Sequence, residues 1–318
     1  MELRIARETD AQQVVDLLTA VFPHVPRTCR SWRWSCITSP GVAVVAVNDG
    51  AIIGHHSFRF QRFELDGRQL MGAFGQQTAV RHDHRNLAAA VALYQEAERL
   101  AGAHCHFAYG FPNRRMSVVN EKVLGYHMLS RFEAWELPQV EFVQRVAQEA
   151  IPPDPALSVR RIACASEVGF DGPFPGAHCH LRPLKDASWL QWRYFEHPLT
   201  HFPVFAAHRG TRCLGYVVLK LYHDGCDLTG HIVEMTLFAG ETSVRWVLLQ
   251  ASAAFFGHAD AKRVVIWNQD AQHQVLFEGL GFRPTGFTTC LAAKPLGTLD
   301  LDVAGIPWSF DMGTSDAF

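Results

Sequence analysis

The sequence lacks the features that mark membrane-spanning, secreted and nucleic-acid-binding proteins. Its 318 residues contain no apolar run near the about 20 residues that cross a bilayer, and the N-terminus has no signal-peptide-like apolar stretch. The net charge is only -2 with histidine neutral, which gives no electrostatic footprint for nucleic acid or an acidic membrane. The eight cysteines form no Cys-x-x-Cys pair, so we expect reduced thiols in a cytoplasmic protein.

Composition and histidine spacing indicate a globular protein of two domains without a metal site. The chain is 48% hydrophobic and 19% charged, as is typical of globular proteins, and its length predicts two domains. The triplets 104–106 and 178–180 both read His-Cys-His. On a strand, such a triplet places two histidines on one face and the cysteine on the other. Since zinc needs four convergent ligands, no metal is predicted.

Residues 70–126 carry the strongest pattern. Residues 70–80 read as a strand, 81–85 as a polar turn, and 86–100 as an Ala-Leu-rich helix. Arg85 stands just ahead of the small residues 88–90 at the helix start. Unpaired N–H groups and a partial positive charge make such a start an anion site when side chains leave the backbone accessible. The alternative is a buried, alanine-rich helix start with no ligand.

A strand at 105–110, a turn at Asn113 and a helix ending at Leu124-Gly125-Tyr126 follow. This order resembles the acyl-CoA-binding half of the GNAT N-acetyltransferase superfamily, in which a turn Arg/Gln-x-x-Gly-x-Gly/Ala holds the CoA pyrophosphate. Here alanine replaces both glycines of that turn. The resemblance implies acetyl-CoA as cosubstrate. The residues that would bind it are Thr78, Ala79, Val80, Arg85, Asn86, Leu87, Ala88, Ala89, Ala90, Asn113 and Asn120.

The second half of the chain reads as another copy of the first. Trp32-Arg33-Trp34 matches Trp192-Arg193-Tyr194, and residues 276–282 resemble the family's Leu-Tyr-Glu-Lys-Leu-Gly-Phe segment. The predicted fold class is therefore α+β, with two tandem GNAT-like domains, each a mostly antiparallel sheet flanked by helices. Residues 1–151 would form the domain with the acyl-CoA site. Residues 152–318 would form a domain with a degenerate CoA motif and a docking aromatic tail.

The expected chemistry needs a group that takes a proton from the attacking amine. GNAT enzymes usually use a glutamate on the fourth strand and a tyrosine in the last helix. In the first copy those places hold Gln76, Gln77 and Asn120, and in the second they hold Glu234 and Phe277. The candidate catalytic groups are Glu234, His84 and the terminal carboxylate of Phe318. Each has a purely structural alternative: a half-exposed strand carboxylate, a solvated loop histidine and a packing aromatic.

The resemblance implies an acyl-CoA-dependent N-acyltransferase that acts on the amine of a small molecule or peptide, with no nucleic-acid or membrane partner. The backbone near Thr78 and Val80 would hold the thioester oxygen. Two other interpretations stay open. One is an aminoacyl or peptidyl transferase of the Fem type, which needs no CoA. The other is a non-catalytic GNAT-fold module that binds a small molecule.

Overall fold

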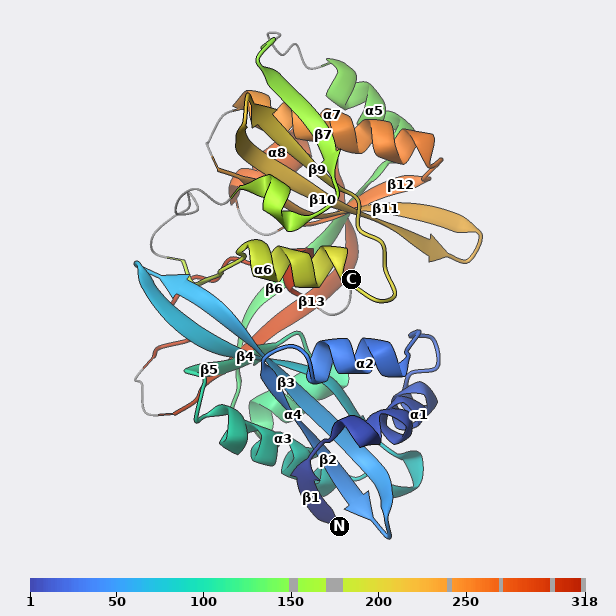
Figure 1. Cartoon of the computed structure of the whole chain (residues 1–318), viewed down its shortest axis with the longest axis vertical. Helices are drawn as coiled ribbons and strands as arrows, with labels where there is room; N and C mark the ends of the chain where they lie inside the picture. Colours follow the sequence, from blue (N-terminus) through green and yellow to red (C-terminus); the bar gives the residue numbers. More distant parts are fainter. Residues whose placement is uncertain (149–153, 170–179, 239–241, 269–270, 298–300, 316–318) are drawn as a thin grey trace. The chain divides into compact units, whose positions relative to one another are not determined.

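The computed structural model describes residues 1–148, 154–169, 180–238, 242–268, 271–297 and 301–315 (Figure 1). The chain divides into two compact units, which we call unit 1 and unit 2 and describe separately. Unit 1 comprises Met1–Arg131, His178–Leu184 and Thr289–Trp308. Unit 2 comprises Phe132–Ala177, Lys185–Thr288 and Ser309–Phe318.

Unit 1 is built on one mixed sheet in the order β1-β2-β3-β4-β5-β13, with β8 added to β3. The first four strands are antiparallel, and β5 runs parallel to β4. The elements are β1 (Glu2–Ile5), η1 (Glu8–Asp10), α1 (Ala11–Val21), α2 (Cys29–Cys36), β2 (Gly41–Asn48), β3 (Ala51–Leu65), β4 (Arg68–Val80), η2 (His82–His84), α3 (Leu87–Ala101), β5 (Phe107–Gly110), α4 (Arg114–Lys122) and β8 (Arg182–Pro183).

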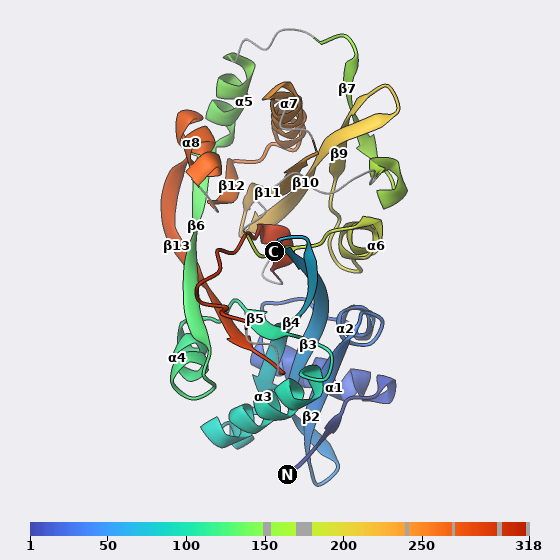
Figure 2. The ribbon, with the colours of Figure 1, turned by 90° about the vertical axis from the view of Figure 1, so that its left-hand side faces the viewer.

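Both faces of this sheet are buried. Successive strand residues point to opposite sides, so each face packs with its own set of core residues. On β2, Ala43 and Val45 pack with α1 and α2, whereas Val44 and Ala46 pack with α3. Figure 2 shows α1 and α2 on one side of the strands and α3 on the other. Strands buried on both faces read as continuous apolar runs, as β2 does.

In unit 2 the strands follow the order β6-β12-β11-β10-β9-β7, and β11 and β12 are parallel. Its elements are α5 (Gln139–Gln148), β7 (Leu157–Ile162), η3 (Ala165–Val168), α6 (Ala187–Leu190), η4 (Gln191–Phe195), β9 (Val204–Arg209), β10 (Arg212–Asp224), β11 (Asp227–Leu237), α7 (Thr242–His258), β12 (Arg263–Asn268), α8 (Ala271–Gly279) and η5 (Met312–Thr314). α5 and α7 pack together on one face of the sheet (Figure 2). Their core contains Phe142, Leu248 and Phe256, all fully buried.

Two long strands serve both units. β6 (His127–Pro138) begins in unit 1, and its residues 133–138 pair with β12 in unit 2. β13 (Arg283–Pro295) begins in unit 2, and its residues 292–295 pair with β5 in unit 1. The sheet of unit 1 is thus completed by a strand from the far end of the chain.

The predicted fold class is confirmed: mostly antiparallel sheets flanked by helices occur in both halves of the chain. The boundary predicted between residues 151 and 152 lies in the segment 149–153, outside the described residues, and stays a prediction. In the part of the chain that the structure describes, no helix is long and apolar enough to cross a membrane.

Candidate functional site

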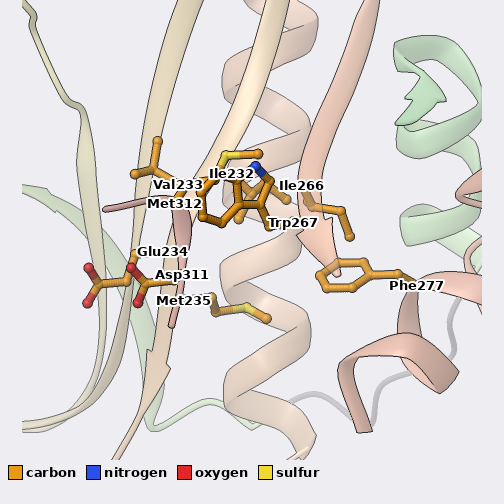
Figure 3. Close-up of a pocket in the computed structure, with 9 residues that line it drawn as sticks. All are labelled: Ile232, Val233, Glu234, Met235, Ile266, Trp267, Phe277, Asp311 and Met312. Atoms are coloured by element: carbon orange, nitrogen blue, oxygen red, sulfur yellow. The ribbon is translucent and has the colours of Figure 1, made fainter. Parts of the chain in front are cut away.

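The sheet of unit 2 opens between its two parallel strands. β11 and β12 pair only through residues 229–231 and 263–265. Beyond that point β11 carries an extra residue, because Val218 on β10 lies opposite Glu234 while Leu219 lies opposite Ile232. Such a bulge bends a strand and increases its twist. A cavity of about 50 Å³ lies at this opening (Figure 3). Its walls are Ile232, Val233, Glu234, Met235, Ile266, Trp267, Phe277, Asp311 and Met312.

Glu234, the first candidate catalytic residue, is buried and fully hydrogen-bonded. Its Oε1 accepts from the hydroxyls of Tyr216 and Thr236. Its Oε2 accepts from the hydroxyl of Tyr194 at 2.5 Å and from Nζ of Lys185 at 2.8 Å. Burial by itself raises the pKa of Glu234, but the Lys185 charge and the hydroxyl donors outweigh it and hold the pKa below its usual range. Glu234 is therefore a well-stabilised carboxylate with no vacant oxygen.

Asp311 is the second carboxylate at this cavity, and it shares Lys185 with Glu234. Figure 3 shows the two carboxylates next to each other, with Phe277 across the cavity. Burial and the Glu234 charge raise the pKa of Asp311 against the opposing effect of Lys185. The side chain of Asp311 is 21% exposed, against 1% for Glu234. Of the two, Asp311 is the carboxylate better placed to take up a proton.

The C-terminal segment that carries Asp311 is fixed inside unit 2. Nε of Arg193 donates to the carbonyl of Gly313 and Nη2 to that of Ser315, both at 2.8 Å. A side chain at position 313 would overlap the hydroxyl of Tyr194 and lie 3.1 Å from Oε2 of Glu234. Only glycine therefore lets the segment approach the buried carboxylate this closely.

In unit 1 the parallel strands β4 and β5 also pair over a short stretch. These strands pair through residues 72–74 and 107–109 only. Just beyond, a Cβ on Gly110 would lie 3.4 Å from the carbonyl oxygen of Gly75, so the two backbones run close together with no side chain between them. Gln77 then adopts a φ of 56°, which is uncommon for a residue other than glycine. The register against β3 shifts at this irregularity.

A buried polar network lies beside the irregular part of β4. Nδ1 of His56 is 2.8 Å from Oγ1 of Thr78, which donates to the hydroxyl of Tyr94 at 3.2 Å. The rings of His56 and Tyr94 stack at 3.9 Å. Nδ1 of His55 is 2.8 Å from the carbonyl of Gln77. Burial lowers the pKa of His55 to about 4 and that of His56 to about 3, so both imidazoles are neutral at pH 7.

The predicted phosphate turn lies at an exposed helix start. Arg85, Asn86, Leu87 and Ala88 are exposed, whereas Ala89 is buried and Ala90 half-buried. Oδ1 of Asn86 caps α3 by accepting from the N–H of Ala89 at 2.8 Å. Leu87 and Ala88 stand in the first turn of α3, where a helix supplies no intrahelical acceptor for the backbone N–H groups. Nε of the exposed Arg85 donates to the carbonyl of Val80 at 3.4 Å.

The other two asparagines of the predicted CoA site have different surroundings. Oδ1 of Asn113 caps α4 by accepting from the N–H groups of Arg115 and Met116, at 3.1 and 3.0 Å. Asn120 is buried, and its Oδ1 has no hydrogen-bond partner within the described residues. Asn113 thus serves as the N-cap of α4, whereas Oδ1 of Asn120 is a buried acceptor without a hydrogen bond among the described residues.

The two remaining catalytic candidates differ in what the structure shows. Nδ1 of His84 lies 2.9 Å from Oδ1 of Asp83 and 3.2 Å from Nη2 of Arg81, on an exposed turn. Phe318 lies outside the described residues. The roles assigned to both stay predictions.

Sequence reasoning missed Lys185, Asp311, Tyr194 and Tyr216 as partners of Glu234. Tyr194 aligns with Trp34 in the internal repeat, and this was the one available signal. The other three stand in a connection, in the tail and on a strand, where nothing local indicates that they meet. For metals, within the described residues no three histidine, cysteine or acidic side chains come together. His178 and Cys179 lie outside those residues.

No family model and no curated protein matches the sequence of this chain. Solved structures do match its fold. A conserved protein of unknown function from Enterococcus faecalis, described as a probable N-acyltransferase, superposes with a TM-score of 0.69 at 11% identity, over 92% of this chain and 72% of the other. A GCN5-related N-acetyltransferase from Anabaena variabilis gives a TM-score of 0.67 at 11% identity, with the same coverage.

A third similar structure has the same two-copy organisation. It is a tandem GNAT protein from the clavulanic acid biosynthesis pathway, with a TM-score of 0.58 at 13% identity. The match covers 94% of this chain and 99% of that one. Together these likenesses show a tandem fold of the GCN5-related N-acetyltransferase type. At such low identity they show the fold alone.

Proposed function

We propose that this chain, whose fold is that of the GCN5-related N-acetyltransferases, is an acyl-CoA-dependent N-acyltransferase acting on the amine of a small molecule or peptide. The observation that carries the proposal is the start of α3 in unit 1. There Arg85, Leu87 and Ala88 are exposed, and the first N–H groups of a helix have no intrahelical acceptor. Backbone donors at a helix start with an adjacent arginine suit a pyrophosphate.

The rest of the cosubstrate would lie along β4 beyond residue 74, where its pairing with β5 ends. Backbone N–H groups between Thr78 and Val80 would then stabilise the negative charge that develops on the thioester oxygen. Alanine at positions 88 and 90, in place of the family's glycines, adds a methyl group at each point where the pyrophosphate would approach the backbone. Ala88 is nevertheless exposed, so its backbone can be reached.

The proposed reaction is direct transfer within a ternary complex. The amine nitrogen attacks the thioester carbonyl carbon, the carbon–sulfur bond breaks, and the acyl group becomes an amide. One proton leaves the nitrogen and one ends on the CoA thiol. The candidate proton acceptors are the three that the sequence indicates: Glu234, His84 and the Phe318 carboxylate.

Calorimetric titration with acetyl-CoA tests the proposal. We expect micromolar affinity and one molecule per chain. If no binding is detected with acetyl-CoA or longer acyl-CoA esters, the proposal is wrong and a Fem-type transferase becomes the better interpretation. If acyl-CoA binds but a panel of amines and peptides releases no free CoA, the non-catalytic interpretation is favoured.

A further inference from the structure

Two buried hydrogen bonds connect α2 to the irregular part of β4 in unit 1. Nε1 of Trp32, on α2, donates to Nε2 of His55 at 3.2 Å, and Nδ1 of His55 lies 2.8 Å from the carbonyl oxygen of Gln77. His55 is fully buried and Trp32 is 2% exposed. The connection therefore reaches the main chain of β4 at the residue whose φ is 56°.

The direction of both hydrogen bonds follows from the indole of Trp32. An indole N–H can only donate, so Nε2 of His55 is an acceptor and carries no hydrogen. Burial lowers the pKa of His55 to about 4, so the ring is neutral at pH 7 and holds its single hydrogen on Nδ1. Nδ1 therefore donates to the carbonyl of Gln77. Trp32 thus selects the tautomer that can bind this carbonyl.

The side chain of Gln77 is held by the same helix. Its Nε2 donates to Oγ of Ser35 at 3.0 Å, and its Oε1 accepts from Sγ of Cys36 at 3.6 Å. A residue other than glycine keeps a positive φ only where its surroundings hold it there. Helix α2 holds Gln77 through its side chain and, by way of His55, through its carbonyl. α2 therefore fixes the backbone conformation of Gln77.

Fixing the carbonyl of Gln77 also fixes the next backbone N–H. The peptide between Gln77 and Thr78 is trans and planar, so its C=O and N–H point in opposite directions. Because the carbonyl points at His55 on β3, the N–H of Thr78 points away from His55. Thr78 lies past residue 74, where the pairing of β4 with β5 ends. This N–H is among the donors proposed above for the thioester oxygen.

We propose that His55 is a positioning residue for acyl transfer: its Nδ1–H holds the peptide between Gln77 and Thr78 so that the N–H of Thr78 donates to the thioester oxygen. The inference rests on the proposed function and adds to it a residue that acts through the backbone. A preset donor costs no reorganisation when negative charge develops on that oxygen. The alternative is that the same hydrogen bonds only stabilise the fold.

Calorimetry on the full chain with acetyl-CoA and with S-ethyl-CoA, a thioether that lacks the carbonyl oxygen, tests the proposal. Wild type should bind acetyl-CoA about fivefold more tightly than the thioether, which is the worth of one hydrogen bond. His55→Asn keeps a donor at the place of Nδ1 and should keep this preference. His55→Gln places its amide at the position of Nε2 instead, where it contacts Trp32 but not the carbonyl of Gln77, and should abolish the preference.

His208→Gln is the matched control, since His208 is a buried histidine on β9 in unit 2. It should keep the preference for acetyl-CoA even if it lowers the melting temperature. A second measurement needs no variant, because NMR of the histidine ring nitrogens reports the tautomer in wild type. His55 should carry its hydrogen on Nδ1.

Circular dichroism and thermal melting establish that each variant is folded before its affinities are compared. The inference is overturned, with the proposed function left standing, if wild type binds both ligands equally well or if His55→Asn and His55→Gln show the same preference. It is also overturned if the hydrogen of His55 lies on Nε2. If wild type binds neither ligand, the proposed function is wrong as well.

Discussion

Nζ of Lys185 lies 2.8 Å from Oε2 of Glu234, so this candidate base is one half of a buried ion pair. Burial lowers the pKa of Lys185, but the charges of Asp311 and Glu234 outweigh it and keep the pKa above its usual value. The ammonium therefore stays charged at neutral pH. The stability of unit 2 therefore depends on the charges of Lys185, Glu234 and Asp311, which come from three different segments of the chain.

Removing one member of this pair should destabilise unit 2. Glu234→Gln leaves Lys185 with Asp311 alone, and we expect a loss of about 3 kcal/mol, the usual cost of breaking a buried pair. The double variant Lys185→Met/Glu234→Gln should lose less than the sum of the two single variants. Chemical denaturation of all three measures the coupling. If the losses simply add, the two side chains do not act as a pair.

Charge at the start of α3 should abolish CoA binding. Ala88→Glu places bulk and negative charge against the exposed N–H groups, and we expect acetyl-CoA affinity to fall at least a hundredfold with the fold intact. Ser243→Glu is the matched control, since it adds the same charge to the first turn of α7 in unit 2. It should leave the stoichiometry at one. Two CoA molecules per wild-type chain would contradict the assignment of a single site.

The terminal carboxylate can be tested without changing any side chain. A C-terminal amide removes the charge of Phe318, and a one-residue extension displaces it, while both keep the aromatic ring. If this carboxylate accepts the proton, turnover with an identified amine should fall at least tenfold in both. Turnover that survives both changes would exclude it. Glu234→Gln, together with a thermal melt, would then be the next variant to measure.

Because the buried histidines of unit 1 are neutral, we expect the free energy of unfolding to decrease as the pH is lowered. In the unfolded chain a histidine takes up a proton below about pH 6.5, whereas folded His56, with a pKa of about 3, does not. The unfolded state therefore binds more protons, and each such histidine costs about 1.4 kcal/mol per pH unit as the pH falls from 6 to 4. His56→Gln should reduce this slope by that amount.

The control for the histidine experiment is a buried neighbour without a titratable group. Phe58→Leu should lower the free energy of unfolding by about 1–2 kcal/mol at every pH, because Phe58 packs edge-on against His56 at 4.8 Å and carries no charge. Its pH slope should equal that of wild type. Equal slopes for wild type and His56→Gln would show that His56 is not neutral in the folded protein.

Gly313 and Gly279 form a natural pair for a further test. Gly313→Ala forces the tail away from Tyr194, and we expect a loss of at least about 2 kcal/mol, as for an overpacked core. Gly279→Ala adds a methyl group to the end of α8 with no heavy atom within 4 Å, and it should be neutral or slightly stabilising. Thermal melting compares them. Equal melting temperatures would mean that the tail adapts without cost.

The sequence predicted the elements better than their partners. Residues 86–100 were expected to form a helix, and α3 spans Leu87–Ala101, because helix starts and apolar spacing are local properties. The fold class followed from the repeat and the family resemblance. That Thr289–Trp308 belongs with the first 131 residues could not be read locally, since a strand's own sequence does not say which distant strand it pairs with. For the same reason the sequence did not predict that Lys185 and Asp311 join Glu234.

The shared strand β13 also decides when unit 1 can be finished during synthesis. Until residues 292–295 emerge, β5 remains an open sheet edge, which is a site for unwanted pairing. At about 5–20 residues per second, the ribosome needs on the order of ten seconds to move from the end of the first segment to this strand. The N-terminal half must therefore wait, incomplete, for the C-terminal half, and a chain released early would expose that edge permanently.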